Sequence, residues 1–361
     1  MATSIGLPEI NVIFIQKAET AIRRSEKGIV MLLLVDTVAN ITDKVYTSDE
    51  QAAADGWTDE NKKYLELTFA GNPNKVYVHQ MASGYTIADE IKKLGNWKWN
   101  YLAFPKAILA DQTAIIAWIK ARRDTDHKIY KYCGGGLATP DNEGIINFDS
   151  ENVKISNYST KLKKEQYACR IAGLAAGCPL TESLTYQVMS EVESFDELDD
   201  DNARNAAINA GKLILINDGE NIRIARGVNS LTTTTNTKGE KFCKIRFIET
   251  KDTITEDITT TIKNEWLGKV PNTYDNKLIL AGAITSYLNV LVGEELLDGN
   301  QENKCVVDFE AQRKYLQDKG VDVDNMDDLE ILKYNTGDKV FLKVMAYDAD
   351  TMEDFDIKIY V

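Results

Sequence analysis

A continuous apolar run, Ile29–Val35, opens a segment in which short strands and helical stretches alternate along the chain. A strand that is apolar at every position is typical of a sheet buried on both faces. The alternation predicts a parallel or mixed sheet that helices cover, which is an α/β fold. Strands are predicted over residues 29–35, 75–79, 99–104 and 128–133, and helices within 49–70 and over 87–94 and 111–123.

The chain beyond residue 160 continues in the same style and ends in strands. No linker rich in Pro, Gly or Ser separates its pieces, which indicates one compact body with two extended arms. We divide it into an N-terminal arm over 1–27, an α/β core over 28–240, a more helical part over 241–335, and C-terminal strands with an arm over 336–361. Further helices are predicted over 164–176, from about 199, and over 253–268, 276–298 and 308–319, and further strands over 212–217, 221–225, 241–250, 340–347 and 355–361.

Both ends of the chain carry β-strand patterns. Chain ends usually fray, so a strand at a terminus needs a sheet that receives it. We therefore predict that the two ends form intersubunit arms that pair with neighbouring copies of the chain. The residues assigned to the C-terminal arm are Phe355, Ile357, Ile359 and Val361, and those assigned to the N-terminal arm are Ile10, Val12, Ile13, Phe14 and Ile15.

The composition excludes several classes of partner. The net charge of -14 argues against nucleic acid or an anionic membrane as the main partner. The 5 cysteines form no CxxC pair and leave one unpaired in any disulfide scheme, which favours reduced thiols in a cytosol. The longest apolar run is too short to cross a bilayer, and the N-terminus lacks the pattern of a signal peptide, so we expect no direct membrane insertion.

Residues that carry catalysis or bind cofactors are scarce. The chain has 2 histidines, His79 on a predicted strand and His127 in a turn, and neither lies in a motif such as GxSxG that presents a catalytic triad. Three glycines over 134–136 follow a strand, but they lack the GxGxxG spacing and the Walker lysine of a phosphate site. We predict no catalytic residue and no cofactor.

Two acidic clusters, over 196–201 and 322–327, invite comparison with calcium sites. An EF-hand loop that begins at Asp322 needs Gly at its sixth position and Glu at its twelfth, where Asp327 and Lys333 stand. The other cluster lacks the glycine as well. Carboxylates at helix N-termini explain both clusters, because the helix dipole stabilises negative charge there. We predict no metal site.

Three segments in the second half of the chain carry a family resemblance. They read CPLTESLTY over 178–186, AGKLILINDGENIRI over 210–224 and ARGVNSLTT over 225–233. In content and order they resemble the contractile tail sheath proteins of bacteriophages and phage-tail-like bacteriocins, and the short chain resembles a minimal sheath of the Gram-positive type. The family motif is assigned to Arg226, Gly227, Val228, Asn229, Leu231 and Thr232.

The resemblance implies a structural polymer subunit and no enzyme. Sheath subunits stack as hexameric rings around a tail tube in a metastable extended state, and a baseplate trigger lets them contract and drive the tube through a target envelope. They exchange N- and C-terminal arms with neighbouring copies by strand addition. Their central module has a subtilisin-like topology, and this sequence shows no triad to accompany it. The implied partners are further copies of the chain, the tube, the baseplate and the tail terminator, in a virion tail or tail-like particle made in the host bacterial cytoplasm.

Two assignments stay open from the residues alone. The tube-facing element of the family is a C-terminal helix, and residues 308–319 match it best, with Arg313, Lys314 and Lys319 as candidate tube contacts or simply as a solvated face. The alternative to a sheath is a cytosolic α/β enzyme or small-ligand-binding protein with its site at the carboxyl edge of the sheet, near residues 134–136.

Overall fold

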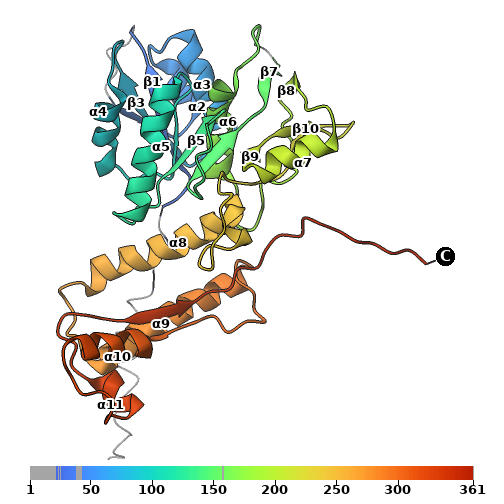
Figure 1. Cartoon of the computed structure of the whole chain (residues 1–361). Helices are drawn as coiled ribbons and strands as arrows, with labels where there is room; N and C mark the ends of the chain where they lie inside the picture. The colour runs from blue at the N-terminus through green and yellow to red at the C-terminus, as the bar shows by residue number, and fades with distance from the viewer. Residues whose placement is uncertain (1–21, 23, 25, 38–42, 157, 361) are drawn as a thin grey trace, which may run out of the picture. The chain divides into compact units, whose positions relative to one another are not determined.

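The computed structural model describes residues 22, 24, 26–37, 43–156 and 158–360 (Figure 1). The chain forms two compact units. Of the described residues, those within 26–252 and 351–360 form the α/β unit, and 253–350 form the helical unit together with residues 22 and 24. Outside the described residues lie the predicted arm residues Ile10, Val12, Ile13, Phe14, Ile15 and Val361.

Within the described residues, a seven-stranded sheet forms the centre of the α/β unit, in the order β2-β3-β1-β4-β5-β6-β9. All neighbours run parallel except β2 and β3, which are antiparallel. The predicted mixed sheet is confirmed. Its strands are β1 (Ile29–Val35), β2 (Lys44–Tyr46), β3 (Lys75–Met81), β4 (Tyr101–Ala103), β5 (Lys131–Gly135), β6 (Ile145–Phe148) and β9 (Lys212–Leu213).

Helices cover both faces of this sheet (Figure 1). β1 sends apolar side chains alternately to the two faces, so both faces need to be covered. Val30, Leu32 and Leu34 lie in a core with residues of α3 and α6. Met31 and Leu33 lie in a second core with residues of α4 and α5. These helices are α2 (Asp49–Ala54), α3 (Asp59–Phe69), α4 (Ile87–Lys93) with a 3-10 turn at Leu94–Asn96, α5 (Leu109–Asp124) and α6 (Lys164–Gly177).

Two glycines let α6 lie directly against the end of α3. A Cβ atom on Gly173 would stand 1.9 Å from the carbonyl oxygen of Thr68, and one on Gly177 would stand 2.0 Å from that of Gly71. A larger residue at either position would push the two segments apart, so the glycines are required by close approach.

A buried ion cluster fixes the beginning of α8 (Ile245–Thr261) to the sheet. The guanidinium of Arg123 donates two hydrogen bonds to Asp252, at 2.9 and 3.1 Å, and Nζ of Lys131 lies 3.1 Å from the same carboxylate. Lys131 also pairs with Glu249 at 2.8 Å, and the hydroxyl of Tyr101 donates to Glu249. Burial alone would raise the pKa of Asp252, but the charges of Lys131 and Arg123 hold it well below its usual range.

The predicted strand over 241–250 is wrong. A 3-10 turn, Glu240–Cys243, leads instead into α8. The alternation of apolar residues in this stretch is compatible with a strand, but Glu249 and Asp252 must both face the cluster. Residues three apart share a face only on a helix, so the buried ion cluster decides the conformation.

Two smaller sheets complete the α/β unit. β7 (Glu151–Ile155) pairs with β8 (Val192–Asp196), and β10 (Leu215–Asn217) pairs with β11 (Ile222–Ile224) as the predicted hairpin. Gly219 in its turn has a φ of 94°, which glycine adopts without strain. Asp200 caps α7 (Asp201–Asn209) by accepting from the N–H of Ala203 at 2.7 Å. The first acidic cluster therefore serves a helix N-terminus, as expected.

The helical unit is built around α9 (Tyr274–Gly293), whose buried side chains include Leu280, Ile284 and Leu288. The strands β12 (Lys304–Val307) and β13 (Leu342–Met345) pair antiparallel. Asp327 caps α11 and thereby accounts for the second acidic cluster. The remaining elements are the end of α8, the π-helical turn Ile262–Trp266, α10 (Phe309–Asp318) and α11 (Asp328–Lys333).

The structure divides the chain differently from our prediction. We expected one body with a change near residue 240, whereas two units form and the α/β unit extends to Asp252. The ion cluster explains the extension, because Asp252 belongs to the packing of the sheet. Residues 351–361 also return to the α/β unit, although we had grouped 336–361 together.

Candidate functional site

The last described residues, 355–360, form an exposed segment that we call the C-terminal arm (Figure 1). Phe355, Ile357 and Ile359 are 70%, 75% and 81% exposed. Within the described part of the chain, the arm is not paired as a strand. A row of exposed apolar side chains marks a surface that binds something else. The predicted intersubunit pairing of the arm stays a prediction.

Glu353, two residues before the C-terminal arm, is held in a polar pocket that we call the Glu353 seat. Oε1 of Glu353 accepts hydrogen bonds from the hydroxyls of Ser183 and Thr185, both at 2.9 Å. Oε2 lies 3.3 Å from Nη2 of Arg226 and 3.6 Å from Nζ of Lys244. The Glu353 side chain is only 7% exposed. Two hydroxyl donors and two nearby cations therefore hold this carboxylate in place.

Electrostatic interactions hold Glu353 in its seat at neutral pH. Burial raises the pKa of Glu353, but the hydroxyls of Ser183 and Thr185 and the nearby Lys244 and Arg226 outweigh it, and the pKa falls below its usual value. Asp354 extends the grip, since Arg226 donates to both of its oxygens at 2.6 and 3.3 Å. Both carboxylates are therefore ionised beside the guanidinium.

The seat is built by segments that carry the family resemblance. The hydroxyl of Thr185 accepts from the N–H of Gly227 at 2.9 Å, and the carbonyl of Gly227 accepts from the N–H of Ile245 at 3.0 Å. The turn around Thr185, the motif and the beginning of α8 are thus joined by hydrogen bonds. The side chain of Arg226 extends from this junction to Glu353.

The rest of the motif braces the same junction against the sheet. The side chain of Asn229 donates to the carbonyl of Phe242 at 2.7 Å and accepts from the N–H of Leu231 at 2.9 Å. The N–H of Thr232 donates to Asp141 at 2.8 Å, and Val228 bridges to Lys244. All six assigned motif residues therefore lie in one hydrogen-bonded connector. Glu353, Ser183 and Lys244 were missed by sequence reasoning.

In the helical unit, β12 has an edge that faces away from β13. The register pairs Cys305 with Val344, and beyond it the N–H of Asp308 donates to the carbonyl of Phe341 at 3.0 Å. Hydrogen-bonded pairs alternate along an antiparallel ladder. The backbone groups of Cys305 and Val307 must therefore turn toward the opposite edge.

A groove of about 390 Å³ lies along this edge of β12, between the strand and α9. Thr285 on α9 reaches the edge, and its hydroxyl accepts from the N–H of Cys305 at 3.0 Å. Ala281 and Gly282 are small and leave room on the helix side of the groove. The groove is lined by Tyr274, Leu278, Ala281, Gly282, Thr285, Cys305, Val306, Val307 and Leu332.

The three candidate tube contacts lie on the surface of the helical unit, on α10 and at its end. Arg313 pairs with Asp324 at 3.0 Å. Lys314 is exposed, and Nζ of Lys319 lies 5.8 Å from the ring centroid of Tyr315. These positions are available to a partner, and their contact with a tube stays a prediction.

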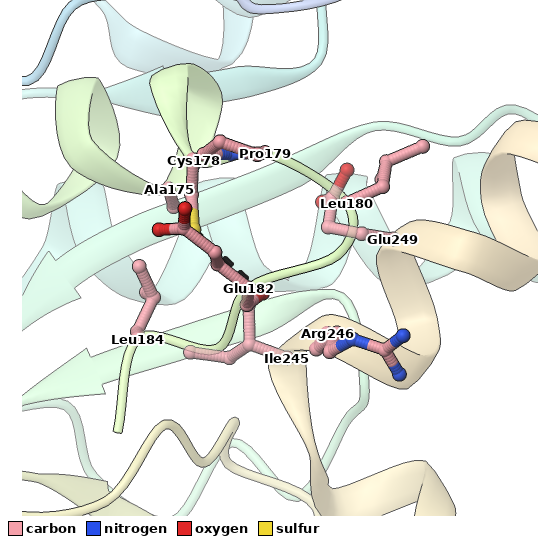
Figure 2. Close-up of a pocket in the computed structure, with 9 residues that line it drawn as sticks. All are labelled: Ala175, Cys178, Pro179, Leu180, Glu182, Leu184, Ile245, Arg246 and Glu249. Carbon is pink, nitrogen blue, oxygen red and sulfur yellow. Dashed lines mark hydrogen bonds between the residues drawn. The ribbon is translucent and has the colours of Figure 1, made fainter. Parts of the chain in front are cut away.

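Figure 2 shows a pocket of the α/β unit where α6 ends and α8 begins. It encloses about 10 Å³, which is room for about one water molecule. Burial and the charge of Glu182 raise the pKa of Cys178 to about 12, so the thiol is protonated at neutral pH and is a poor nucleophile. This pocket does not fit a substrate.

The other positions considered for chemistry have structural contacts. The ring nitrogens of His79 lie 2.6 Å from Asp43 and 2.8 Å from Glu90. His127 lies in a turn with a φ of 52°. A Cβ atom on Gly135 would stand 2.2 Å from the backbone of Lys164, so the first turn of α6 occupies the place that a ligand near residues 134–136 would need.

Among the described residues, no three His, Cys, Asp or Glu side chains are arranged to hold a metal ion. One described helix, α9, is long and apolar enough to cross a membrane by length and composition alone. Its Leu280, Ile284 and Leu288 are buried within the helical unit, which is the pattern of a core helix.

Two family models match successive parts of this chain. The phage tail sheath protein central domain matches residues 80–230, and the phage tail sheath C-terminal domain matches residues 237–361. The fold is therefore that of a two-part sheath protein. The chain belongs to the phage tail sheath family and is a subunit of a contractile tail sheath, which makes it a component of an oligomeric assembly in a phage tail.

The relatives agree with this assignment. The tail sheath protein of Clostridium phage phiCD119 is 38% identical over 98% of this chain and 99% of its own length. The uncharacterized protein YqbK of Bacillus subtilis is 25% identical over 69% of this chain and 50% of its own length.

Solved structures share the fold at low sequence identity. The sheath tail protein of Desulfitobacterium hafniense has a TM-score of 0.73 and 15% identity, over 98% of this chain and 97% of that one. The helical sheath of the anti-feeding prophage in its contracted state has a TM-score of 0.72 and 13% identity, over 100% and 99%. At these identities the likeness concerns the fold.

Proposed function

We propose that this subunit joins copies of itself by adding its C-terminal arm as a strand to the sheet of a neighbouring copy. The observation that carries the proposal is the exposed row of Phe355, Ile357 and Ile359, three apolar side chains at alternate positions of one extended segment. Strand addition satisfies the arm's backbone groups and buries one face of its alternating pattern. Main-chain hydrogen bonds then supply attachment, and the apolar face supplies register.

The sheet of β12 and β13 is the receiver that we propose. It has two strands, and the backbone groups of Cys305 and Val307 turn toward its outer edge beside α9. By the same alternation, Leu342 and Val344 turn toward the outer edge of β13. At the β12 edge an incoming strand would replace the hydrogen bond between Cys305 and Thr285. Two edges suit one C-terminal and one N-terminal arm. The N-terminal arm residues, which lie outside the described residues, enter on their sequence pattern and on the resemblance.

Connected in this way, subunits would form hexameric rings that stack around a tail tube. Assembly in a metastable extended state stores the energy that contraction releases, so the mechanism needs no nucleotide and no catalytic residue. A baseplate would trigger contraction, a terminator would close the far end, and the moving tube would cross a target envelope. Arms that stay paired keep the lattice connected while the bodies of the subunits slide.

The tube contact that we propose is α10 with Arg313, Lys314 and Lys319. A contact that must release during contraction should be weak, and exposed ion pairs contribute about 0 to 1 kcal/mol each and are screened by salt. The net charge of -14 disfavours nucleic acid as a partner. We place synthesis and assembly in the host bacterial cytoplasm, without membrane insertion.

Electron microscopy of the purified subunit tests the arm. The double substitution Ile357→Asp and Ile359→Asp should abolish tubes, because it places charge on the face that pairs. The matched control, Asp356→Ser with Lys358→Ser, changes the opposite face and should leave tubes intact. Circular dichroism and thermal unfolding should be unchanged in both variants. Normal tubes from the Ile357 and Ile359 variant would contradict the proposal.

A second pair of variants tests the receiver. Gly282 lies on the helix side of the groove, where an added Cβ atom meets no described atom within 4 Å. Gly282→Leu should fill the groove and block the incoming strand while the fold stays intact, since leucine favours helix over glycine. Gly293→Leu, at the end of the same helix and equally open, is the control. Equal assembly by the two variants would exclude the β12 edge.

A further inference from the structure

We propose that the Glu353 seat fixes the root of the C-terminal arm and thereby sets how far the arm reaches toward a neighbouring copy. The inference rests on the proposed strand exchange and assigns a role to residues that the exchange itself does not require. The seat is then a positioning site for the contact between copies. It decides which acceptor the arm can meet.

The boundary between held and free chain lies within two residues. Residues up to Asp350 belong to the helical unit, and those from Thr351 onward belong to the α/β unit. The Glu353 side chain is 7% exposed, whereas Phe355 is 70% exposed. The hydroxyl of Thr351 also lies 3.3 Å from Oε1 of Glu353. The chain is thus held immediately before the C-terminal arm begins.

The partners of Glu353 come from three places in the sequence. Ser183 and Thr185 are 170 and 168 residues away, Arg226 belongs to the family motif, and Lys244 precedes α8. The motif and the turn around Thr185 are already fixed to each other through Gly227. A seat on such a rigid junction holds the arm's exit in a constant position relative to the α/β unit.

The seat limits the length of the free segment. From Phe355 to Tyr360 an extended arm spans about 20 Å, at about 3.3 Å per residue. Each residue released before Phe355 would add about 3.3 Å to the free segment, so release of Glu353 and Asp354 would lengthen it by about 7 Å. A longer tether lowers the effective concentration of the arm at its acceptor and admits more than one neighbour.

Two insertions separate the seat from the arm. A Gly-Ser pair placed between Asp354 and Phe355 lengthens the arm beyond the seat and keeps its side-chain alternation, because two residues preserve the period. The same pair between Asp350 and Thr351 adds slack before the seat. We expect the first insertion to abolish the regular helical order of tubes in electron microscopy, and the second to leave it as in the unaltered protein.

Removing the seat should erase this difference. Glu353→Gln keeps the shape of the side chain and removes the charge that Arg226 and Lys244 neutralise. Tubes of Glu353→Gln should lose helical order, and either insertion added to it should have no further effect. Asp356→Asn, an exposed carboxylate in the arm itself, is the matched control and should keep order. Equal order in the two single insertions, or ordered tubes from Glu353→Gln, would overturn the proposal.

A measurement on the free subunit keeps this test independent of polymerisation. Nuclear magnetic resonance relaxation of the Asp354 amide should report a rigid residue in the unaltered protein and a flexible one in Glu353→Gln, while Tyr360 is flexible in both. If the proposed strand exchange fails, the arm substitutions leave tubes intact and the relaxation change persists. If Asp354 is equally flexible in both proteins, the seat does not hold the arm.

Discussion

The central strand β1 and the C-terminal arm are both apolar strand patterns, and they have opposite surroundings. Every side chain from Ile29 to Leu34 is at most 1% exposed, since strands flank β1 on both sides and helices cover both faces. The arm alternates apolar with polar residues, and Ile357 is 75% exposed. A continuous apolar run is thus typical of a strand that its own chain completes, whereas the alternating run of the arm suits the strand addition that we propose.

Two carboxylates sharpen the same contrast. Asp252 and Glu353 each lie between an arginine and a lysine, and both are buried. Asp252 binds α8 to the sheet, so the fold depends on it. Glu353 holds an extended segment that contributes little to the packed core. Loss of the first should affect stability, and loss of the second should affect assembly.

The largest effect is expected for Asp252→Asn. The substitution leaves Arg123 and Lys131 buried without their shared counter-charge, which costs about 3 to 5 kcal/mol when a buried pair loses one partner. Urea unfolding monitored by circular dichroism should show the loss. Asp356→Asn in the arm is the matched control, and its free energy of unfolding should equal that of the unaltered protein. A comparable loss in both variants would remove the distinction between the regions.

Truncation of one side chain in each strand comes next. Leu32→Ala should lower the free energy of unfolding by about 2 to 5 kcal/mol, because it leaves a cavity in a fully packed core. Ile357→Ala should leave the free energy of unfolding unchanged, because truncation of an exposed side chain creates no cavity. Thermal unfolding of the free subunits measures both. A drop for Ile357→Ala would mean that the arm packs against its own chain in solution.

The parts that sequence could predict follow from local pattern. The period of apolar residues predicted β1, β3, β4 and β5 and the helices between them, because burial in the sheet and its helices repeats at short intervals. It did not predict the short strands β2, β6 and β7. The stretch over 241–250 was misread, since its conformation depends on Asp252 meeting Arg123, which is 129 residues away. The Glu353 seat was missed for the same reason. Its partners are brought together only by the fold.

Acid should weaken the α/β unit through Asp252. Its pKa is depressed in the folded chain by Lys131 and Arg123, so its contribution to stability is complete above its unfolded value of about 3.9 and is lost as the pH falls toward the folded value. In Asp252→Asn, the free energy of unfolding should therefore fall less steeply between about pH 5 and pH 3. Urea titrations at several pH values test this. An unchanged slope would mean that other carboxylates carry the acid sensitivity.

The smallest effect per contact is expected at α10, where the proposed tube contact consists of exposed charges. Reversing Arg313 and Lys314 to Glu should impair assembly on the tube in the extended state and still permit the sheath's own contracted polymer. Each exposed ion pair contributes about 0 to 1 kcal/mol, so the contact gains strength only because it is repeated along the tube. Arg313 also pairs with Asp324, so Asp324→Asn is the control that breaks this pair and keeps the positive charge. Co-sedimentation with the tube at low salt should fall for the reversed variant and persist for Asp324→Asn. The defect should diminish as salt screens the unaltered contact too. Unchanged co-sedimentation of the reversed variant at low salt would place the tube-facing element elsewhere on the chain.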